Sequence, residues 1–314
     1  MPNILVSGSI AYDYIMDFPD SFKNHILPDQ VHILNLSFNV PELRREFGGS
    51  ATNIAYTIKL LGSEPVVLGA LGTDGQSYRE YLGSKGISTQ YIFQSKEKLT
   101  AAAYITTDRD DNQIAAFYIG PCGEADKISA HDVKETLALA LISPTVKDVM
   151  IKHAKECAEK KIPIVFDPGQ SITSLSAQEL MLLLGQADFL IGNDYELKLL
   201  QDRTGWDTKE LFNHVEVIIT TLGEKGSVVS TKDEMIEVSP CPAESVEDPT
   251  GAGDAYRAGF FAAYVKGMDF KTCGQAGSVA ATYAVEHYGT QNHRFTKAEF
   301  AERYEKTYNQ TITL

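Results

Sequence analysis

The second half of the chain has the pattern that most restricts the fold. From about residue 137 onward, short apolar segments alternate with helical patterns, and three of the apolar segments (162–166, 187–191 and 217–221) end in polar or glycine-containing turns. Apolar strands alternating with helices are typical of a parallel, doubly wound sheet covered on both faces. Parallel strands end at one edge of such a sheet, and ligands bind there. We therefore predict an α/β protein with its site at that edge.

The N-terminal part continues this pattern. Ile4–Val6 and Pro65–Leu71 are apolar runs that end in small-residue turns, as buried strands do. Asp13 follows the first of these turns. Its carboxylate could accept hydrogen bonds from substrate hydroxyls, or it could be an ordinary loop residue, and its immediate neighbours favour the second interpretation.

A second, smaller sheet is predicted apart from the main one. Residues 100–107 and 113–118 have strand patterns joined by a polar turn, which indicates a hairpin, and 31–38 partly alternates like a strand. These segments belong to two insertions, about 12–46 and 95–120, in a single domain spanning 1–314. A small sheet over a binding cleft would act as a lid and exclude water.

Composition limits the partners. The 314 residues are 43% hydrophobic and carry a formal net charge of -14, which suits one large globular domain. An acidic surface argues against nucleic acid or an anionic membrane as the main partner. The four cysteines are far apart and read as reduced thiols, which predicts a cytoplasmic protein. The sequence shows neither a signal peptide nor an apolar run long enough to span a bilayer.

One turn carries the clearest chemical signal. Residues 248–254 read Asp-Pro-Thr-Gly-Ala-Gly-Asp, and an apolar, helix-compatible run follows immediately. A glycine-rich turn entering a helix offers unpaired N–H groups and a positive dipole end to an anion such as phosphate. Asp254 would repel that anion unless it takes a proton from the attacking group. The turn is therefore either a phosphoryl-transfer site or a helix entry with an acidic first turn, and its local sequence leaves both open.

Two further segments add polar groups. Gly48-Gly49 opens a second helix in which Asn53 lies one turn in, although two glycines at a helix start are a weak signal. Asn193 and Glu196 follow the strand 187–191 and have the spacing of a helix cap with its acidic partner.

Four motifs together resemble the ribokinase-like (PfkB) sugar and nucleoside kinases. They are 48–53, 193–196 (Asn-x-x-Glu), 221–226 and 248–254, in the family's order and across nearly the whole chain. Within the family, 8–13, 34–38, 117–118, 193–196 and 288–291 look like bacterial adenosine kinases. This resemblance implies a ribokinase-like fold and ATP-dependent phosphorylation of the 5′-hydroxyl of adenosine to AMP, a purine salvage reaction.

Two alternatives stay open. One is a sugar kinase of the same family, of the ribokinase or fructokinase type. The other is a nucleoside-binding protein without turnover, against which the retained Asp254 and both glycines of its turn argue. The chain also departs from some adenosine kinases, which carry an aromatic residue near position 103. This chain has alanines at 101–103, so Tyr104 or Phe117 would supply the stacking face.

The resemblance also implies residue roles. Asp254 would be the base, and Gly251, Ala252 and Gly253 would donate N–H groups to the transferred phosphoryl group. Glu196 and Asn193 would hold Mg²⁺ through water. The remaining assignments are nucleoside contacts from Ser9, Asp13, Ser37, Gly49, Asn53, Phe117 and Gln170, and ATP contacts from Asn193, Thr221, Gly223 and Gly226.

Three further expectations complete this picture. K⁺ activates relatives and is a candidate cofactor that the sequence does not decide. The edges of the lid sheet favour pairing into a homodimer. Arg257 would either neutralise phosphate or pair with a surface acid such as Glu247, and the second is the favoured expectation.

Overall fold

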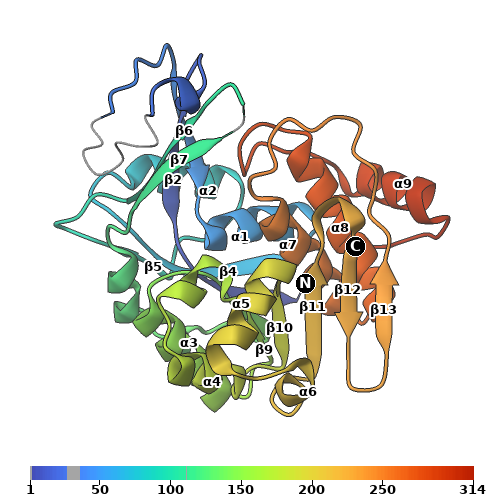
Figure 1. The fold of residues 1–314 in the computed structure, drawn as a ribbon. Helices are drawn as coiled ribbons and strands as arrows, with labels where there is room; N and C mark the ends of the chain where they lie inside the picture. Colours follow the sequence, from blue (N-terminus) through green and yellow to red (C-terminus); the bar gives the residue numbers. More distant parts are fainter. Residues whose placement is uncertain (1, 27–35, 111) are drawn as a thin grey trace.

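A computed structural model describes residues 2–26, 36–110 and 112–314. The main element is a nine-stranded sheet with the order β13-β12-β11-β10-β9-β8-β1-β4-β5 (Figure 1). The strands from β11 to β5 pair in parallel, and β12 and β13 add an antiparallel edge. Their bounds are β1 Asn3–Ser7, β4 Glu64–Leu71, β5 Ile92–Gln94, β8 Leu137–Ile142, β9 Ile164–Phe166, β10 Phe189–Asn193, β11 Val217–Thr221, β12 Ser227–Ser230 and β13 Met235–Val238.

A separate four-stranded sheet has the order β3-β2-β6-β7. Its strands are β2 Ala11–Asp17, β3 Leu43–Gly48, β6 Ala101–Thr107 and β7 Gln113–Tyr118. The central pair β2 and β6 is parallel, and the outer pairs are antiparallel. The strand expected at 31–38 is not found at 36–38, and 31–35 lie outside the described residues. The first insertion instead supplies β2 and β3.

Helices cover both faces of the main sheet (Figure 1). One core joins the sheet to α1, α2, α7, α8 and α9, and the second joins it to α3, α4, α5 and α6. This double cover explains why the strands read as continuous apolar runs. The helices are α1 Ser50–Leu60, α2 Gln76–Ser84, α3 Lys147–Glu159, α4 Ala177–Leu184, α5 Asp194–Thr204, α6 Thr208–Leu211, α7 Ala252–Tyr264, α8 Phe270–Val285 and α9 Lys297–Tyr308, with 3-10 turns at Phe22–Asn24, Cys122–Lys127, Ala130–Asp132, Gly169–Thr173 and Gly223–Lys225.

The predicted doubly wound sheet is thus confirmed, and it defines one functional edge. β1 lies between β8 and β4, so connections leave to opposite sides at this point of the sheet. The carboxyl ends of β1, β8, β9 and β10 open on the same edge, which is where ligands bind in such folds.

Two other sequence expectations concern the cysteines and membrane-spanning helices. The four cysteines are free and buried. Among the described residues, none of the helices has the length and apolar character needed to cross a bilayer.

Candidate active site

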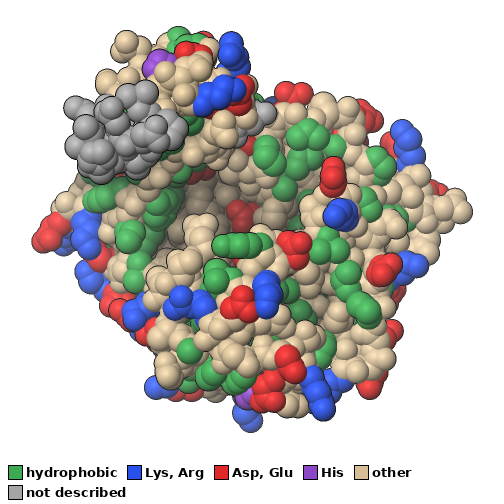
Figure 2. Space-filling model, viewed as in Figure 1, with side chains coloured by type: hydrophobic (Ala, Val, Ile, Leu, Met, Phe, Trp, Pro, Cys, Tyr) green, Lys and Arg blue, Asp and Glu red, His purple; other side chains and the backbone are tan. Residues whose placement is uncertain are grey.

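A cavity of about 400 Å³ opens between the small sheet and the functional edge of the main sheet. Figure 2 shows it as a hollow with acidic side chains at its floor. Ten of the predicted site residues line it, namely Ser9, Asp13, Gly49, Asn53, Phe117, Gln170, Glu196, Gly251, Gly253 and Asp254. The cavity therefore gathers residues from β2, β7, α1, α5, α7 and the turns after β1 and β9.

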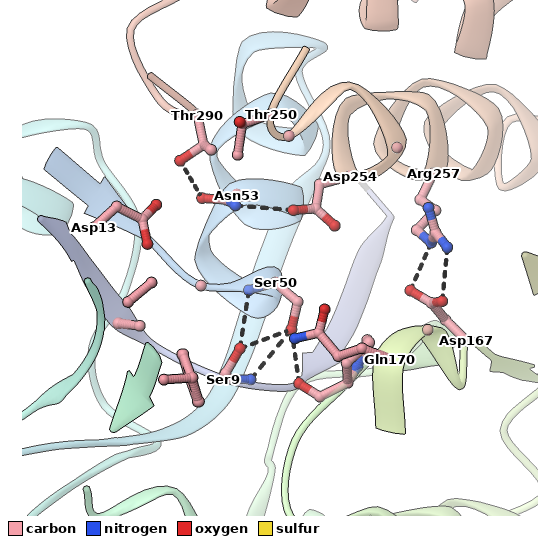
Figure 3. Close-up of a pocket in the computed structure, with 18 of the residues that line it drawn as sticks. Ser9, Asp13, Ser50, Asn53, Asp167, Gln170, Thr250, Asp254, Arg257 and Thr290 are labelled. Carbon is pink, nitrogen blue, oxygen red and sulfur yellow. Dashed lines mark hydrogen bonds and ion pairs between the residues drawn. The ribbon is translucent and has the colours of Figure 1, made fainter. Parts of the chain in front are cut away.

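Asp254 lies in the first turn of α7, with its carboxylate facing the cavity (Figure 3). The turn is possible because Gly251, at φ 81°, takes a left-handed conformation that side chains disfavour. Asn53 Nδ2 donates a hydrogen bond to Asp254 Oδ2 at 2.8 Å. Burial raises the pKa of the Asp254 carboxyl, while Arg257 and the Asn53 hydrogen bond oppose that rise.

Asp13 enters the cavity from β2, across from Asp254 (Figure 3). Its side chain is almost fully buried, and burial followed by repulsion from Asp254 raises its pKa to about 7. A side chain at Gly48 would collide with the Asp13 carboxylate, which explains the first glycine of the Gly48-Gly49 pair. Asp13 therefore lies on a strand and lines the cavity, and it is not the ordinary loop residue that its neighbours favoured.

The second glycine brings two turns together. Gly49 has φ 93°, and a Cβ there would lie 2.6 Å from both Ala11 N and Ser9 O. Ser9 Oγ in turn accepts a hydrogen bond from Ser50 N at 3.1 Å, and Ser50 Oγ donates to Pro144 O at 3.0 Å. The Ser9 hydroxyl is thus occupied in fixing the start of α1, although it also faces the cavity.

Arg257 does not pair with Glu247, so the favoured expectation for it is wrong. Its guanidinium lies 2.5 Å from Asp167 Oδ2 through Nε and donates through Nη2 to Asp167 Oδ1 at 2.7 Å (Figure 3). Both side chains are buried, with exposed fractions of 8% and 1%. Burial raises the pKa of Asp167 and Arg257 opposes that rise. Arg257 lies one turn beyond Asp254, so its side chain extends along the same side of α7.

Asn193 and Glu196 form a reciprocal cap at the start of α5. Asn193 Oδ1 accepts from Glu196 N at 2.7 Å, and Glu196 Oε2 accepts from Asn193 N at 2.9 Å. Glu196 lines the cavity, whereas Asn193 does not. The capping interpretation is therefore present in the structure, and it leaves the second carboxylate oxygen of Glu196 available.

The small sheet resolves which aromatic residue faces the cavity. Ala103 pairs with Phe117, and both line the cavity. Tyr104 points to the opposite face, where its ring stacks on Tyr14 at 4.9 Å. Side chains alternate along a strand, so Phe117 is the aromatic group above the cavity. With an exposed fraction of 48%, its ring is not buried within the small sheet.

Other expected residues lie off the cavity. Ser37 and Ala252 are not among its lining residues, and neither are Asn193, Thr221, Gly223 and Gly226, which lie around the ends of β10 and β11. Ser50, Asp167 and Thr290 also line the cavity, and their sequence context did not predict them as site residues. Each adjoins a recognised motif or strand end, so position alone was a usable signal.

The cavity is strongly acidic. Its lining contains the carboxyl groups of Asp13, Asp167, Glu196 and Asp254, and Arg257 is the one Lys or Arg among the lining residues. A phosphorylated ligand in this space would be repelled unless cations accompany it. Within the described parts of the chain, no group of three or more His, Cys, Asp or Glu side chains could hold a metal by itself.

The fold and this cavity define a ribokinase-like α/β protein. The chain belongs to the pfkB family carbohydrate kinases, whose family model matches residues 2–297. It is therefore a kinase of this family, as the four motifs predicted.

Relatives cover the chain almost end to end. A nucleoside kinase of Methanocaldococcus jannaschii is 34% identical over 309 residues, which are 98% of each chain. The structure of Burkholderia thailandensis nucleoside kinase in complex with inosine superposes with a TM-score of 0.90 at 37% identity, covering 98% of this chain and 99% of that one. Its complex with ADP-inosine has a TM-score of 0.88 at 39% identity, with 98% and 97% covered.

Proposed function

We propose that this protein transfers the γ-phosphoryl group of ATP to the 5′-hydroxyl of a purine nucleoside, with adenosine as the expected acceptor and AMP as the product. The carrying observation is that Asp254, at the N-terminus of α7, shares one cavity with Asp13 and Phe117. The similarity to nucleoside kinases, one of them in complex with inosine, supports this class of acceptor.

Phosphoryl transfer depends on alignment and charge neutralisation more than on covalent help. Asp254 accepts the proton of the 5′-hydroxyl, and its raised pKa makes the carboxylate a better base than an exposed aspartate. The N–H groups at the start of α7 stabilise the charge on the transferred group. Ala252 N already makes a long hydrogen bond of 3.3 Å to Pro249 O, so Gly253 N is the better placed donor.

The nucleoside is assigned to the side of the cavity below the small sheet. Asp13 binds ribose hydroxyls, with Gly49 and Asn53 beside it, and the exposed ring of Phe117 stacks on the base. Ser9 and Gln170 also line the cavity and are further candidates for nucleoside contacts, whereas Ser37 is not a lining residue and is the weakest candidate.

ATP is assigned to the neighbouring surface at the ends of β10 and β11, where Thr221, Gly223 and Gly226 lie. The acidic cavity needs a cation beside the phosphates, and its donor set of carboxylates suits Mg²⁺. Glu196 and Asn193 would hold the ion through water, and its charge would neutralise the phosphate oxygens. K⁺ stays a candidate activator.

A substrate panel tests the proposal. ADP formation from ATP would be measured with adenosine, inosine, guanosine, cytidine, uridine, ribose and fructose, with Asp254→Asn as the background control. We expect a purine nucleoside to give the highest kcat/KM. Preference for ribose or fructose would instead establish a sugar kinase, such as the ribokinase of Bacillus subtilis, a relative at 26% identity. Binding of nucleoside without ADP formation would indicate a binding protein.

The small sheet also supports the proposal of a homodimer. We further propose that the protein is cytoplasmic, with reduced cysteines. β7 is exposed along its whole length, and Ile114, Tyr118 and Ile119 present apolar side chains that do not line the cavity. An exposed edge strand of this kind favours pairing with another sheet. Light scattering should give twice the chain mass, and Ile114→Lys should shift it toward one chain mass. A parent protein of single-chain mass at micromolar concentration would contradict the dimer.

A further inference from the structure

Asn53 stands at the centre of a buried hydrogen-bond chain that ends on Asp254. Its Nδ2 donates to Asp254 Oδ2 at 2.8 Å. Its Oδ1 accepts from Gln291 Nε2 at 2.8 Å and from Thr290 Oγ1 at 2.9 Å. Figure 3 shows Asn53 between Thr290 and Asp254. Asn53, Thr290 and Gln291 are each at most 5% exposed, so water does not compete freely with these bonds.

The charge of Asp254 sets which way these hydrogen bonds run. An ionised carboxylate can only accept hydrogen bonds, so Asn53 must turn its Nδ2 toward Asp254. Its Oδ1 then faces Gln291, which must present its own N–H₂ group. A reversed Asn53 amide would place two acceptors against each other at 2.8 Å. The orientation of Gln291 is therefore linked to the charged state of Asp254.

We propose that Gln291, assisted by Thr290, is a positioning residue for the base Asp254 and acts through the Asn53 amide. This inference rests on the proposed function, since it assigns Asp254 the role of base. Gln291 touches neither the reacting atoms nor Asp254. Its task is to keep the donor face of Asn53 on the carboxylate.

Gln291 and Thr290 differ in how firmly they hold the Asn53 amide. Gln291 Nε2 has two hydrogens, and the second bond runs to Tyr78 Oη at 2.9 Å. Tyr78 Oη lies 2.6 Å from Gly48 O, to which it donates, so the Gln291 amide is held at two points. Thr290 has one hydroxyl hydrogen for two acceptors, Asn53 Oδ1 and Phe47 O, both at 2.9 Å. Gln291 is accordingly the permanent donor and Thr290 a shared one.

The same loop joins the base to the small sheet. Tyr288 Oη accepts from Arg44 Nη2 at 2.7 Å, and Asn292 Nδ2 donates to Glu46 Oε2 at 2.9 Å. Both partners lie on β3 of the small sheet. Residues 288–292 thus contact β3 on one side and Asn53 on the other. A shift of β3 would therefore be passed through this loop and Asn53 to Asp254.

The test uses Gln291→Met, which keeps the side-chain length and removes both donors. Gln275→Met is the matched control, because Gln275 is also buried and bonded to a tyrosine hydroxyl, in α8. Two readouts are needed: kcat against pH, and the titration of the Asp254 carboxyl carbon by NMR, assigned by its loss in Asp254→Asn. We expect Gln291→Met to lower kcat about tenfold at pH 7 and to move both midpoints upward by about one pH unit, the size of one weakened hydrogen bond to a charged group.

A double-mutant cycle separates positioning from general loss of structure. In an Asn53→Ala background, Gln291→Met should produce no further shift of the Asp254 midpoint. Thr290→Val should have a smaller effect than Gln291→Met, and Thr290→Ser should restore most of it. An unchanged Asp254 midpoint in Gln291→Met, or a full shift without Asn53, would overturn the inference. A parent protein without turnover on any acceptor would refute the proposed function instead, and the carboxyl titration would still be readable.

Discussion

Replacing Asp254 by Asn tests its proposed role as the base. The change exchanges one carboxylate oxygen for an NH₂ group of nearly the same size. The remaining oxygen can still accept the 2.8 Å hydrogen bond from Asn53, so the cavity should keep its shape. A positioned base contributes about 10²- to 10⁴-fold to rate. At about 1.4 kcal/mol per tenfold, this is roughly 3–6 kcal/mol of transition-state stabilisation.

Ligand binding should respond differently from turnover. Repulsion from Asp254 is one cause of the raised pKa of Asp13. A neutral residue at position 254 removes that repulsion, so the Asp13 carboxylate ionises more easily and nucleoside affinity should be kept or increased. The assay pairs steady-state ADP formation with calorimetric titration of the nucleoside. We expect kcat to fall at least about 100-fold with Kd within about threefold of the parent.

Residual activity needs one control, because deamidation of the introduced side chain would regenerate the parent enzyme. Intact-mass analysis of each preparation measures that fraction. A homogeneous variant with kcat within about threefold of the parent would refute the assignment of Asp254 as the base. A Kd weakened as much as kcat would show that the residue acts in binding instead.

Three further outcomes are expected. Asp13→Asn should weaken nucleoside binding more than ATP binding in separate titrations. The fold raises the pKa of the Asp13 carboxyl to about 7, so ionising this carboxyl costs stability as pH rises from about 4 to 7. Asp13→Asn removes that cost and should raise the free energy of urea unfolding by up to about 4 kcal/mol at pH 8, but by little near pH 4. Equal gains at both pH values would contradict this reasoning. Arg257→Met should lower the free energy of unfolding by about 3–5 kcal/mol, because the buried Asp167 carboxyl loses its partner and must either stay charged or take up a proton, and adding Asp167→Asn should recover part of the loss in thermal unfolding. Phe117→Ala should raise the nucleoside KM about tenfold or more through lost stacking, and Tyr104→Ala, on the opposite face, should not; equal effects would place the base elsewhere.

The main sheet was predictable because of how it is buried. Strands such as Val217–Thr221 have helices on both faces, so their sequences are continuous apolar runs with clear ends. The antiparallel edge β12 and β13 was missed, since its residues alternate and are partly polar. β5 has three residues and too little pattern to detect. In the first insertion, β3 reads Leu-Arg-Arg-Glu-Phe-Gly, and its charged residues gave no strand signal.

The candidate site was predictable where local chain geometry fixes it. Glycine turns at the starts of α1 and α7 mark Gly49 and Asp254 by sequence alone. The partner of Arg257 was not predictable in this way. Its helix brings it level with Asp254, but the sequence does not show that Asp167, at the end of another strand, lies opposite. Pairings between distant elements depend on the whole packed fold.

The small sheet, with β2 and β6 paired at its centre, has a consequence for how the structure opens locally. These two central strands of the small sheet are separated along the chain by β4, which belongs to the main sheet. Pairing of β2 with β6 therefore closes a loop that contains a strand of the larger core. The outer strand β7 of the small sheet is exposed along its whole length, and elements with few buried contacts are the ones that open locally. The wall of the cavity that the small sheet forms can thus open at β7 while the buried helix α7, which carries Asp254, stays folded.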